Sequence, residues 1–170
     1  GRAVHEILKF PETLDSISVG LFKEQFVFTT PKSIMITRLY DGRFPDYQRI
    51  LPKECSRHLT LNQKEFQQAL RTVQPLAKNS SQMVHFDVGP NETRIWAESR
   101  EEGMSEVFLS TRLDGDPINI AFNGKYFQDF LGVADTDEIV LDMTSPSYPG
   151  VLKPSRTDNQ FNYVVMPMTF

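Results

Sequence analysis

Two periods of hydrophobic and polar positions organise this 170-residue chain. Apolar residues that recur every three to four positions predict amphipathic helices at residues 2–9, 64–76 and 124–134. Alternating or short apolar runs bounded by turn residues predict strands at residues 16–20, 25–30, 33–40, 57–61, 83–88, 93–99, 105–113, 117–122, 138–144, 150–153 and 161–168. Asn62 and Asn123 directly precede the second and third helices, where an Asn side chain can cap free backbone N–H groups.

The predicted elements form a repeat. A strand, a helix and three further strands occur twice in full and once, at the N-terminus, without the first strand. One such unit cannot bury both its helix and its sheet, so two units should share a core, with helices on one face of antiparallel sheets. The sequence therefore predicts an α+β fold. Residues 1–41 would be the second half of one domain, residues 42–56 a proline-containing connector, and residues 57–170 a complete domain.

Composition narrows the class of protein. Hydrophobic residues make up 39% of the chain, and no apolar run approaches the roughly 18 residues of a membrane span. The single Cys55 permits no internal disulfide and the N-terminus lacks the order of a signal peptide, so we expect a cytoplasmic protein with no membrane partner. The net charge of −4 argues against a continuous basic coat, but it allows a protein that surrounds a duplex and attracts phosphate only on its inner face.

Chemistry-bearing residues give little support for catalysis. His5, His58 and His85 lie far apart in the sequence, without partners at the spacing of a metal site or a catalytic triad. The sequence contains no glycine-rich phosphate-binding motif. The acidic residues between Glu98 and Glu106 lack the spacing of an EF-hand. We therefore expect no catalytic residue, no metal and no cofactor.

The apolar C-terminus is unusual, because chain ends are normally polar and frayed. Residues 163–168, YVVMPM, either complete a core or form the wall of a groove, and flexible Met side chains suit a groove that receives varied ligands. Together with residues 41–53, DGRFPDYQRILPK, this run resembles the bacterial sliding clamp, the β subunit of DNA polymerase III. The resemblance covers the whole chain. It implies a clamp fold of three similar domains with helices lining a central hole, of which this chain looks like a C-terminal portion.

The resemblance also implies functional residues. A pocket for short Gln-, Leu- and Phe-containing peptides would be formed by Pro45, Arg49, Ile50, Asn123, Tyr126, Val164, Val165, Met166, Pro167 and Met168. The polar helix faces toward DNA would carry Arg2, His5, Lys9, Lys64, Gln67, Arg71, Lys125 and Gln128. A head-to-tail contact between protomers would use Pro75, Leu76, Glu101, Glu102 and Glu106. The ending Thr169-Phe170 differs from the Arg-Leu that is common in the family.

The implied function is that of a non-enzymatic processivity factor. Its partners would be duplex DNA, bound without sequence preference, the replicative polymerase, the clamp loader and repair proteins, with a homodimeric ring in the full-length protein. Two other classes stay open. An α+β enzyme would show a deep polar pocket that holds His58 or His85 beside a carboxylate. A stand-alone peptide-binding adaptor would dock peptides without contacting DNA.

Overall fold

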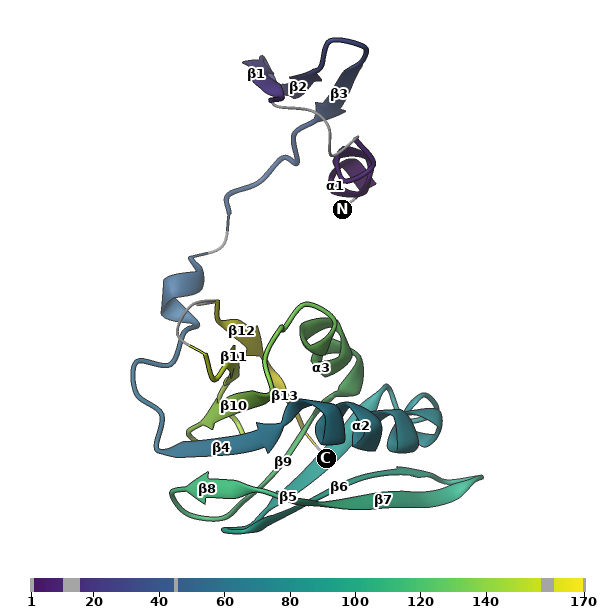
Figure 1. Ribbon diagram of the computed structural model, residues 1–170, viewed down its shortest axis with the longest axis vertical. Coiled ribbons are helices and arrows are strands. Elements are labelled where there is room, and N and C mark those ends of the chain that lie inside the picture. The colour runs from purple at the N-terminus through teal and green to yellow at the C-terminus, as the bar shows by residue number, and fades with distance from the viewer. Residues whose placement is uncertain (1, 11–15, 45, 157–160, 170) are drawn as a thin grey trace. The chain divides into compact units, whose positions relative to one another are not determined.

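The computed structural model describes residues 2–10, 16–44, 46–156 and 161–169 of the chain. They fall into two compact units, Gly1–Pro45 (unit 1) and Asp46–Phe170 (unit 2), shown in Figure 1. The division lies inside the segment expected to be a connector, residues 42–56. The domain boundaries within a longer protein remain a prediction.

Unit 1 contains one helix and one sheet. The helix α1 spans Arg2–Ile7, and β1 (Ser18–Phe22), β2 (Gln25–Thr29) and β3 (Ile34–Arg38) form an antiparallel sheet in that order. The helix is shorter than the predicted 2–9, and the first strand begins two residues later than predicted. Large apolar side chains stay open to solvent, with Leu21 64% and Ile34 67% exposed. Among the described residues of unit 1 no apolar side chain is fully buried, so this unit has no core of its own.

Unit 2 contains the rest of the elements: η1 (Tyr47–Arg49), β4 (Arg57–Asn62), α2 (Gln63–Ala77), β5 (Met83–Val88), β6 (Glu92–Ser99), β7 (Gly103–Ser110), β8 (Arg112–Asp114), β9 (Ile118–Asn123), α3 (Gly124–Leu131), β10 (Glu138–Met143), β11 (Gly150–Pro154), β12 (Tyr163–Val165) and β13 (Pro167–Met168). The strands build two antiparallel sheets. The first sheet has the order β12-β11-β10-β4-β8 and the second the order β13-β9-β5-β6-β7. The predicted α+β class with antiparallel sheets is confirmed.

The two repeats of unit 2 exchange strands. Each sheet takes the first strand of one repeat, β4 or β9, and the three following strands of the other repeat. The predicted single strands 105–113 and 161–168 are wrong for this reason: each is split, at Thr111 and at Met166, where the chain leaves one sheet and enters the other. The side chains keep alternating through the crossing at Thr111, and residues 163–168 are apolar throughout, so the sequence pattern alone does not reveal either change of sheet.

Both long helices start at the predicted caps. The Asn62 side chain accepts hydrogen bonds from the backbone N–H of Lys64 and Glu65, at 3.0 and 3.1 Å, and Asn123 caps Lys125 at 3.0 Å. Helix α3 ends at Leu131, short of the predicted residue 134, because the chain turns at Gly132. Such caps contribute about 1 kcal/mol each.

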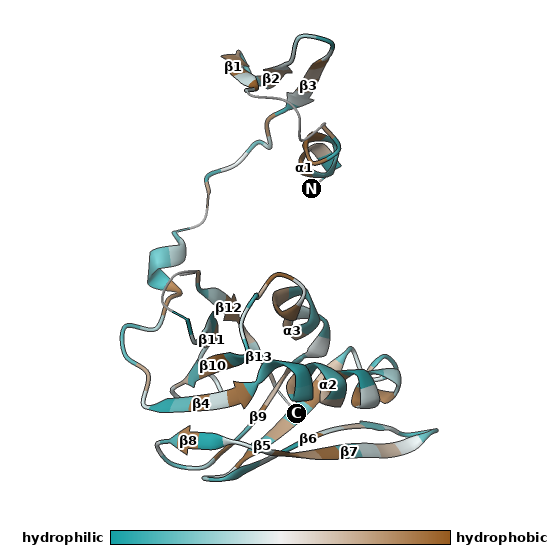
Figure 2. Ribbon diagram, viewed as in Figure 1, coloured by the Kyte–Doolittle hydropathy of each residue, from teal (hydrophilic) through white to brown (hydrophobic). Residues whose placement is uncertain are grey.

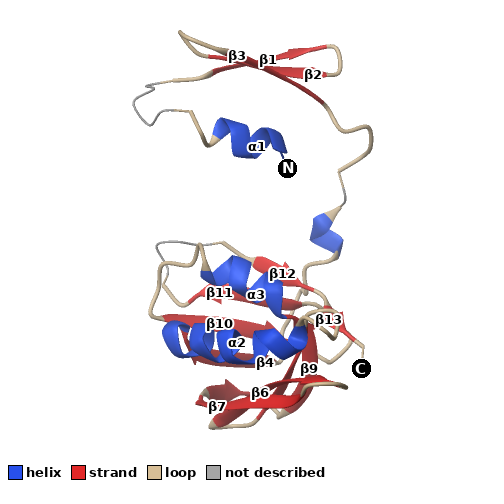
Figure 3. Cartoon of the chain, turned by 90° about the vertical axis from the view of Figure 1, so that its right-hand side faces the viewer, coloured by secondary structure: helices blue, strands red, loops and turns tan. Residues whose placement is uncertain are grey.

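Helices α2 and α3 lie side by side over a core of aromatic rings (Figures 1 and 3). Phe66 of α2 meets Phe127 of α3 edge-on at 5.6 Å between ring centroids, and Phe86 of β5 lies 5.2 Å from Phe127. All three rings are fully buried, and burial of each contributes roughly 1.5–3 kcal/mol. The outward face of α2 is hydrophilic (Figure 2). The core therefore fixes which faces of the helices meet solvent.

Candidate functional site

The end of the chain passes from one sheet of unit 2 to the other. β12 pairs with β11 in the first sheet, whereas Pro167 and Met168 of β13 lie opposite Phe122 and Ala121 of β9 in the second sheet. Met166 stands between the two strands and is 58% exposed. An exposed Met beside a half-buried Pro and Met leaves apolar surface open at this crossing.

A hollow of about 520 Å³ lies at the crossing. It is lined by Met166, Pro167, Met168, Thr169, Pro146 and Ser147. The last two residues belong to the turn between β10 and β11, which sequence reasoning did not connect with the C-terminus. The Pro-Ser-Tyr-Pro composition of that turn signals a loop. Nothing in the local sequence indicates which other segment the loop faces.

The other predicted pocket residues lie outside the lining of this hollow. Phe122 lies opposite Pro167, and Asn123 is the next residue, at the end of β9. The Asn123 side chain caps α3. Tyr126 is 48% exposed on the first turn of α3. Val165 is 2% exposed and belongs to the core, so it holds the strand in place, while Val164 is half-buried.

Two of the connector residues predicted for the pocket, Arg49 and Ile50, belong to unit 2. Arg49 ends η1 and pairs with Asp46 at 2.9 Å, and Ile50 follows it with 47% exposure. Figures 1 and 3 both place η1 beside the end of the first sheet that carries β12. Pro45 lies outside the described residues.

A second hollow, of about 440 Å³, separates the polar sides of α2 and α3. It is lined by Arg71, Gln74, Pro75, Lys78, Gln82, Lys125 and Gln128. The structure thus brings together three residues predicted to face DNA and adds Lys78, which sequence reasoning missed because it ended the helix at residue 76. Leu76, predicted for a protomer contact, packs partly buried against the core.

The remaining residues predicted to face DNA are spread over two units. Lys64 is exposed and Gln67 half-buried on the first half of α2, outside the second hollow. Arg2 and His5 are exposed on α1 of unit 1. Lys9 follows that helix and pairs with Glu6 at 2.9 Å.

The acidic residues predicted for a protomer contact lie on or near β7, which forms the open edge of the second sheet. Glu106 is not free, because its carboxylate pairs with Arg94 at 2.6 Å, and this hydrogen bond is the main cause of the raised pKa of Arg94. Glu102 accepts a hydrogen bond from Asn79 at 2.9 Å. Glu101 is exposed on the turn before β7.

The outer face of the first sheet holds a carboxylate between an ammonium and an imidazole group. Asp142 is 7% exposed and lies 2.6 Å from the Lys153 ammonium and 2.7 Å from His58 Nδ1. This pairing of His58 spans 84 residues of sequence, so no local spacing could reveal it. Burial raises the pKa of the nearby Cys55 thiol, which keeps it protonated and a poor nucleophile.

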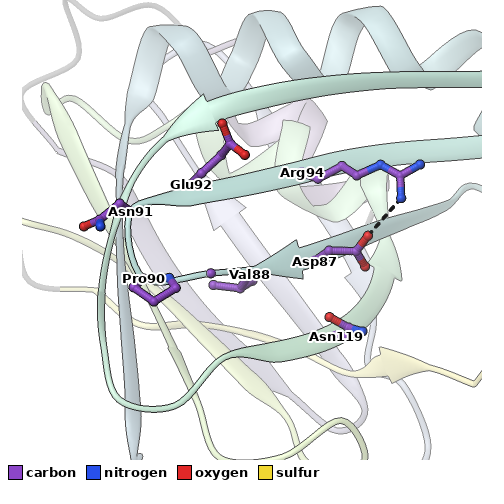
Figure 4. A pocket seen from close by; sticks show the side chains of 8 residues that line it. Asp87, Val88, Pro90, Asn91, Glu92, Arg94 and Asn119 are labelled. Carbon is purple, nitrogen blue, oxygen red and sulfur yellow. Dashed lines mark hydrogen bonds and ion pairs between the residues drawn. The ribbon is translucent and has the colours of Figure 1, made fainter.

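The outer face of the second sheet carries a matching carboxylate, Asp87. It accepts hydrogen bonds from Trp96 Nε1 at 3.0 Å and from Arg94 at 3.2 Å. His85 stacks on Trp96 at 3.9 Å, and burial lowers the pKa of His85. Figure 4 shows residues that line a shallow hollow of about 540 Å³, among them Asp87 and Arg94, whose ion pair is drawn as a dashed line.

The repeat explains the match between the two faces. Asp87 of β5 and Asp142 of β10 occupy equivalent positions, opposite Asn119 and His58 on the first strand of each repeat. Both carboxylates are satisfied by donors on the same sheet. An enzyme was expected to hold His58 or His85 beside a carboxylate in a deep polar pocket. Both histidines lie on the outer faces of the sheets instead, and neither lines any of the three hollows described here. The described residues contain no cluster of three or more potential metal ligands, and no described helix is long and apolar enough to cross a membrane.

Comparison with known proteins decides the family. The profile of the DNA polymerase III beta subunit, C-terminal domain, matches residues 48–169. The chain belongs to this family. The beta sliding clamp of Vibrio cholerae serotype O1 is 34% identical over 143 residues, which is 84% of this chain and 37% of the relative, and that of Pseudomonas putida is 28% identical over 95% of this chain and 43% of the relative.

Solved structures of the beta subunit family share the fold. The Bartonella birtlesii sliding clamp bound to griselimycin is 25% identical with a TM-score of 0.91, covering 99% of this chain and 46% of that one. The Thermotoga maritima beta subunit is 26% identical with a TM-score of 0.81, covering 91% and 42%. This chain thus spans less than half the length of the relatives that it matches. The relatives are named sliding clamps, a family of non-catalytic processivity factors of DNA polymerase III.

Proposed function

We propose that this chain forms the C-terminal part of a sliding clamp that docks partner peptides in the groove where β12 passes into β13. The observation that carries the proposal is the hollow of about 520 Å³ lined by Met166, Pro167 and Met168. Polarizable, flexible Met side chains adapt to different apolar ligands. A peptide that buries one Leu or Phe there gains roughly 1.5–3 kcal/mol before the cost of ordering it.

The rim of the groove supplies polar groups for peptide register. We assign Arg49, Asn123 and Tyr126 to this rim, with Ile50 and Val164 as apolar neighbours. Thr169 also lines the hollow. The partner proteins are the replicative polymerase, the clamp loader and repair proteins, each through a short linear motif.

The helices supply the second part of the proposal. The polar faces of α2 and α3 meet duplex DNA, with Lys64, Gln67, Arg71, Lys125 and Gln128 contacting phosphates without reading bases. In the full-length cytoplasmic protein Arg2 of α1 and Lys9, which follows α1, would add to this face, and two protomers would close a ring around DNA. The open edge strand β7, with Glu101, Glu102 and Glu106 beside it and Pro75 and Leu76 on α2, is the surface that we assign to the protomer contact.

The groove is tested with a matched pair of variants. Met166 is 58% and Met104 54% exposed, so Met166→Glu and Met104→Glu place the same charge at equally open positions of unit 2. A Gln-Leu-Phe peptide is titrated into each protein by calorimetry. We expect Met166→Glu to weaken binding about tenfold or more, which corresponds to 1.4 kcal/mol, and Met104→Glu to leave it unchanged. Equal affinity of the two variants would contradict the assignment of the groove.

A further inference from the structure

The hollow between α2 and α3 gathers positive charge without a neutralising carboxylate. Arg71, Lys78 and Lys125 line it, and the other lining residues are uncharged. None of the three cations forms an ion pair within the described part of the chain. The chain has a net charge of −4, so three unpaired cations around one hollow are a local excess of positive charge. Such an excess indicates a binding site for an anion.

Helix electrostatics explain one of these cations and not the other two. Lys78 is the C-cap of α2, where a positive charge interacts favourably with the helix dipole, whereas Arg71 lies before the last turn, where this effect has fallen off. Lys125 lies in the first turn of α3, where the dipole disfavours a cation, and that turn contains no acidic residue. Placing Lys125 beside two other cations costs free energy unless an anion joins them.

The inner wall of the hollow is polar. Gln74 is 8% exposed and donates from Nε2 to Gln82 Oε1 at 2.5 Å. Its Oε1 accepts no hydrogen bond from any described residue, and because it is buried it is out of reach of a ligand in the hollow. The amide groups of Gln74, Gln82 and Gln128 suit a hydrated ligand more than an apolar group.

We propose that Arg71, Lys78 and Lys125 form one seat that holds a single backbone phosphate of duplex DNA. The proposal rests on the DNA-facing role of the helices and adds two points to it, the participation of Lys78 and the sharing of one phosphate by both helices. The arginine offers a planar fork to two phosphate oxygens, and the lysines act as point charges. The seat contacts the backbone only, so it carries no sequence preference.

The test measures whether the cations act on the same phosphate. A fluorescent short duplex is titrated with the 170-residue chain at about 0.01 M salt, where electrostatic contacts reach furthest. The proteins are wild type, Lys78→Ala, Lys125→Ala, Lys64→Ala and the double variants that combine Lys78→Ala with each of the other two. We expect each single variant to weaken binding about threefold to tenfold.

If two cations contact one phosphate, the losses of binding free energy in the two single variants do not add up in the double variant. If they contact separate phosphates, the losses add up. The Lys78–Lys125 double variant should therefore bind more tightly than the product of the two single losses predicts. The Lys78–Lys64 double variant should match the product, because Lys64 lies outside the hollow. Inorganic phosphate at increasing concentration should shift the backbone amide resonances of Lys78 and Lys125 in the wild type.

Four outcomes overturn the seat. If Lys78→Ala binds the duplex as tightly as the wild type while Lys64→Ala binds it more weakly, the seat is wrong and the DNA-facing role of the helices still holds. Independent losses for Lys78 and Lys125 replace one shared phosphate by two separate contacts. Shifts with inorganic phosphate but unchanged duplex affinity in Lys78→Ala would show a site for free anions instead. If the wild type fails to bind the duplex even at low salt, both the seat and the DNA-facing role are wrong.

Discussion

A methyl group added at Gly124 should destabilise unit 2, whereas the same change at Gly132 should stabilise it. Both glycines stand at an end of α3 with ordinary helical or extended backbone, so Ala is compatible with either backbone. At Gly124 the new Cβ would lie 2.7 Å from Val84 Cγ2 and 2.9 Å from Gln74 Oε1, both closer than atoms can approach. At Gly132 the nearest atoms lie at 3.5 Å, an ordinary contact.

The magnitudes follow from two opposing effects. Replacement of Gly by Ala reduces the entropy of the unfolded chain and stabilises by about 0.4–1 kcal/mol at either position. Overpacking at Gly124 costs about 1–3 kcal/mol, because Val84 is a stiff β-branched residue and Gln74 is held by Gln82. We expect Gly124→Ala to lose about 1–2 kcal/mol net. The difference between the two variants isolates the overpacking cost, since the unfolded-state effect is common to both.

Urea denaturation followed by the fluorescence of Trp96, the only tryptophan, reports on unit 2. The midpoint should fall for Gly124→Ala and rise for Gly132→Ala at unchanged slope. Equal midpoints for the two variants would show that α3 shifts away from Val84 at no cost. The close approach of the two helices would then not depend on glycine.

Other predictions concern the caps, a core ring and a histidine. Asn62→Ala and Asn123→Ala should each lower the free energy of unfolding by about 1 kcal/mol in urea, and a change below about 0.5 would contradict the capping role. Phe127→Ala should cost about 3–5 kcal/mol, measured in the same way; a smaller loss would mean that the ring cluster collapses into the space. Because burial lowers the pKa of His85 below 6.5, the folded state resists its protonation. Stability should therefore fall as pH drops below 6.5 and level off below the folded pKa, and His85→Gln should flatten this part of a urea–pH series.

The hydrophobic pattern of the sequence predicted the features that depend on interactions between residues close in the chain. The apolar faces of α2 and α3, their Asn caps and the repeat of strands and helices were all readable, because each depends on residues a few positions apart. The pattern failed at Thr111, where alternation continues while the partner strand changes, and at Met166, where an apolar run continues through the change. It also failed at His58 and Asp142, which meet across 84 residues. Three residues predicted for the pocket, Met166–Met168, line a hollow together with Pro146 and Ser147, which the sequence did not connect with them because their position depends on the turn after β10. The roles of these residues in binding remain predictions.

The exchange of strands between the repeats has a consequence for how unit 2 acquires its structure. β4 joins its sheet through β10 of the second repeat and through the short β8 of the first repeat, and Arg57 pairs with Met143. The loop between β4 and β10 closes slowly and gains no sheet hydrogen bonds until it does. A ribosome that has released only the first repeat therefore presents an incomplete sheet in which only β8 is available to pair with β4. Pro167 and Met168 of β13 add a strand beside β9 of the second sheet, so the groove forms only after β13 has been made.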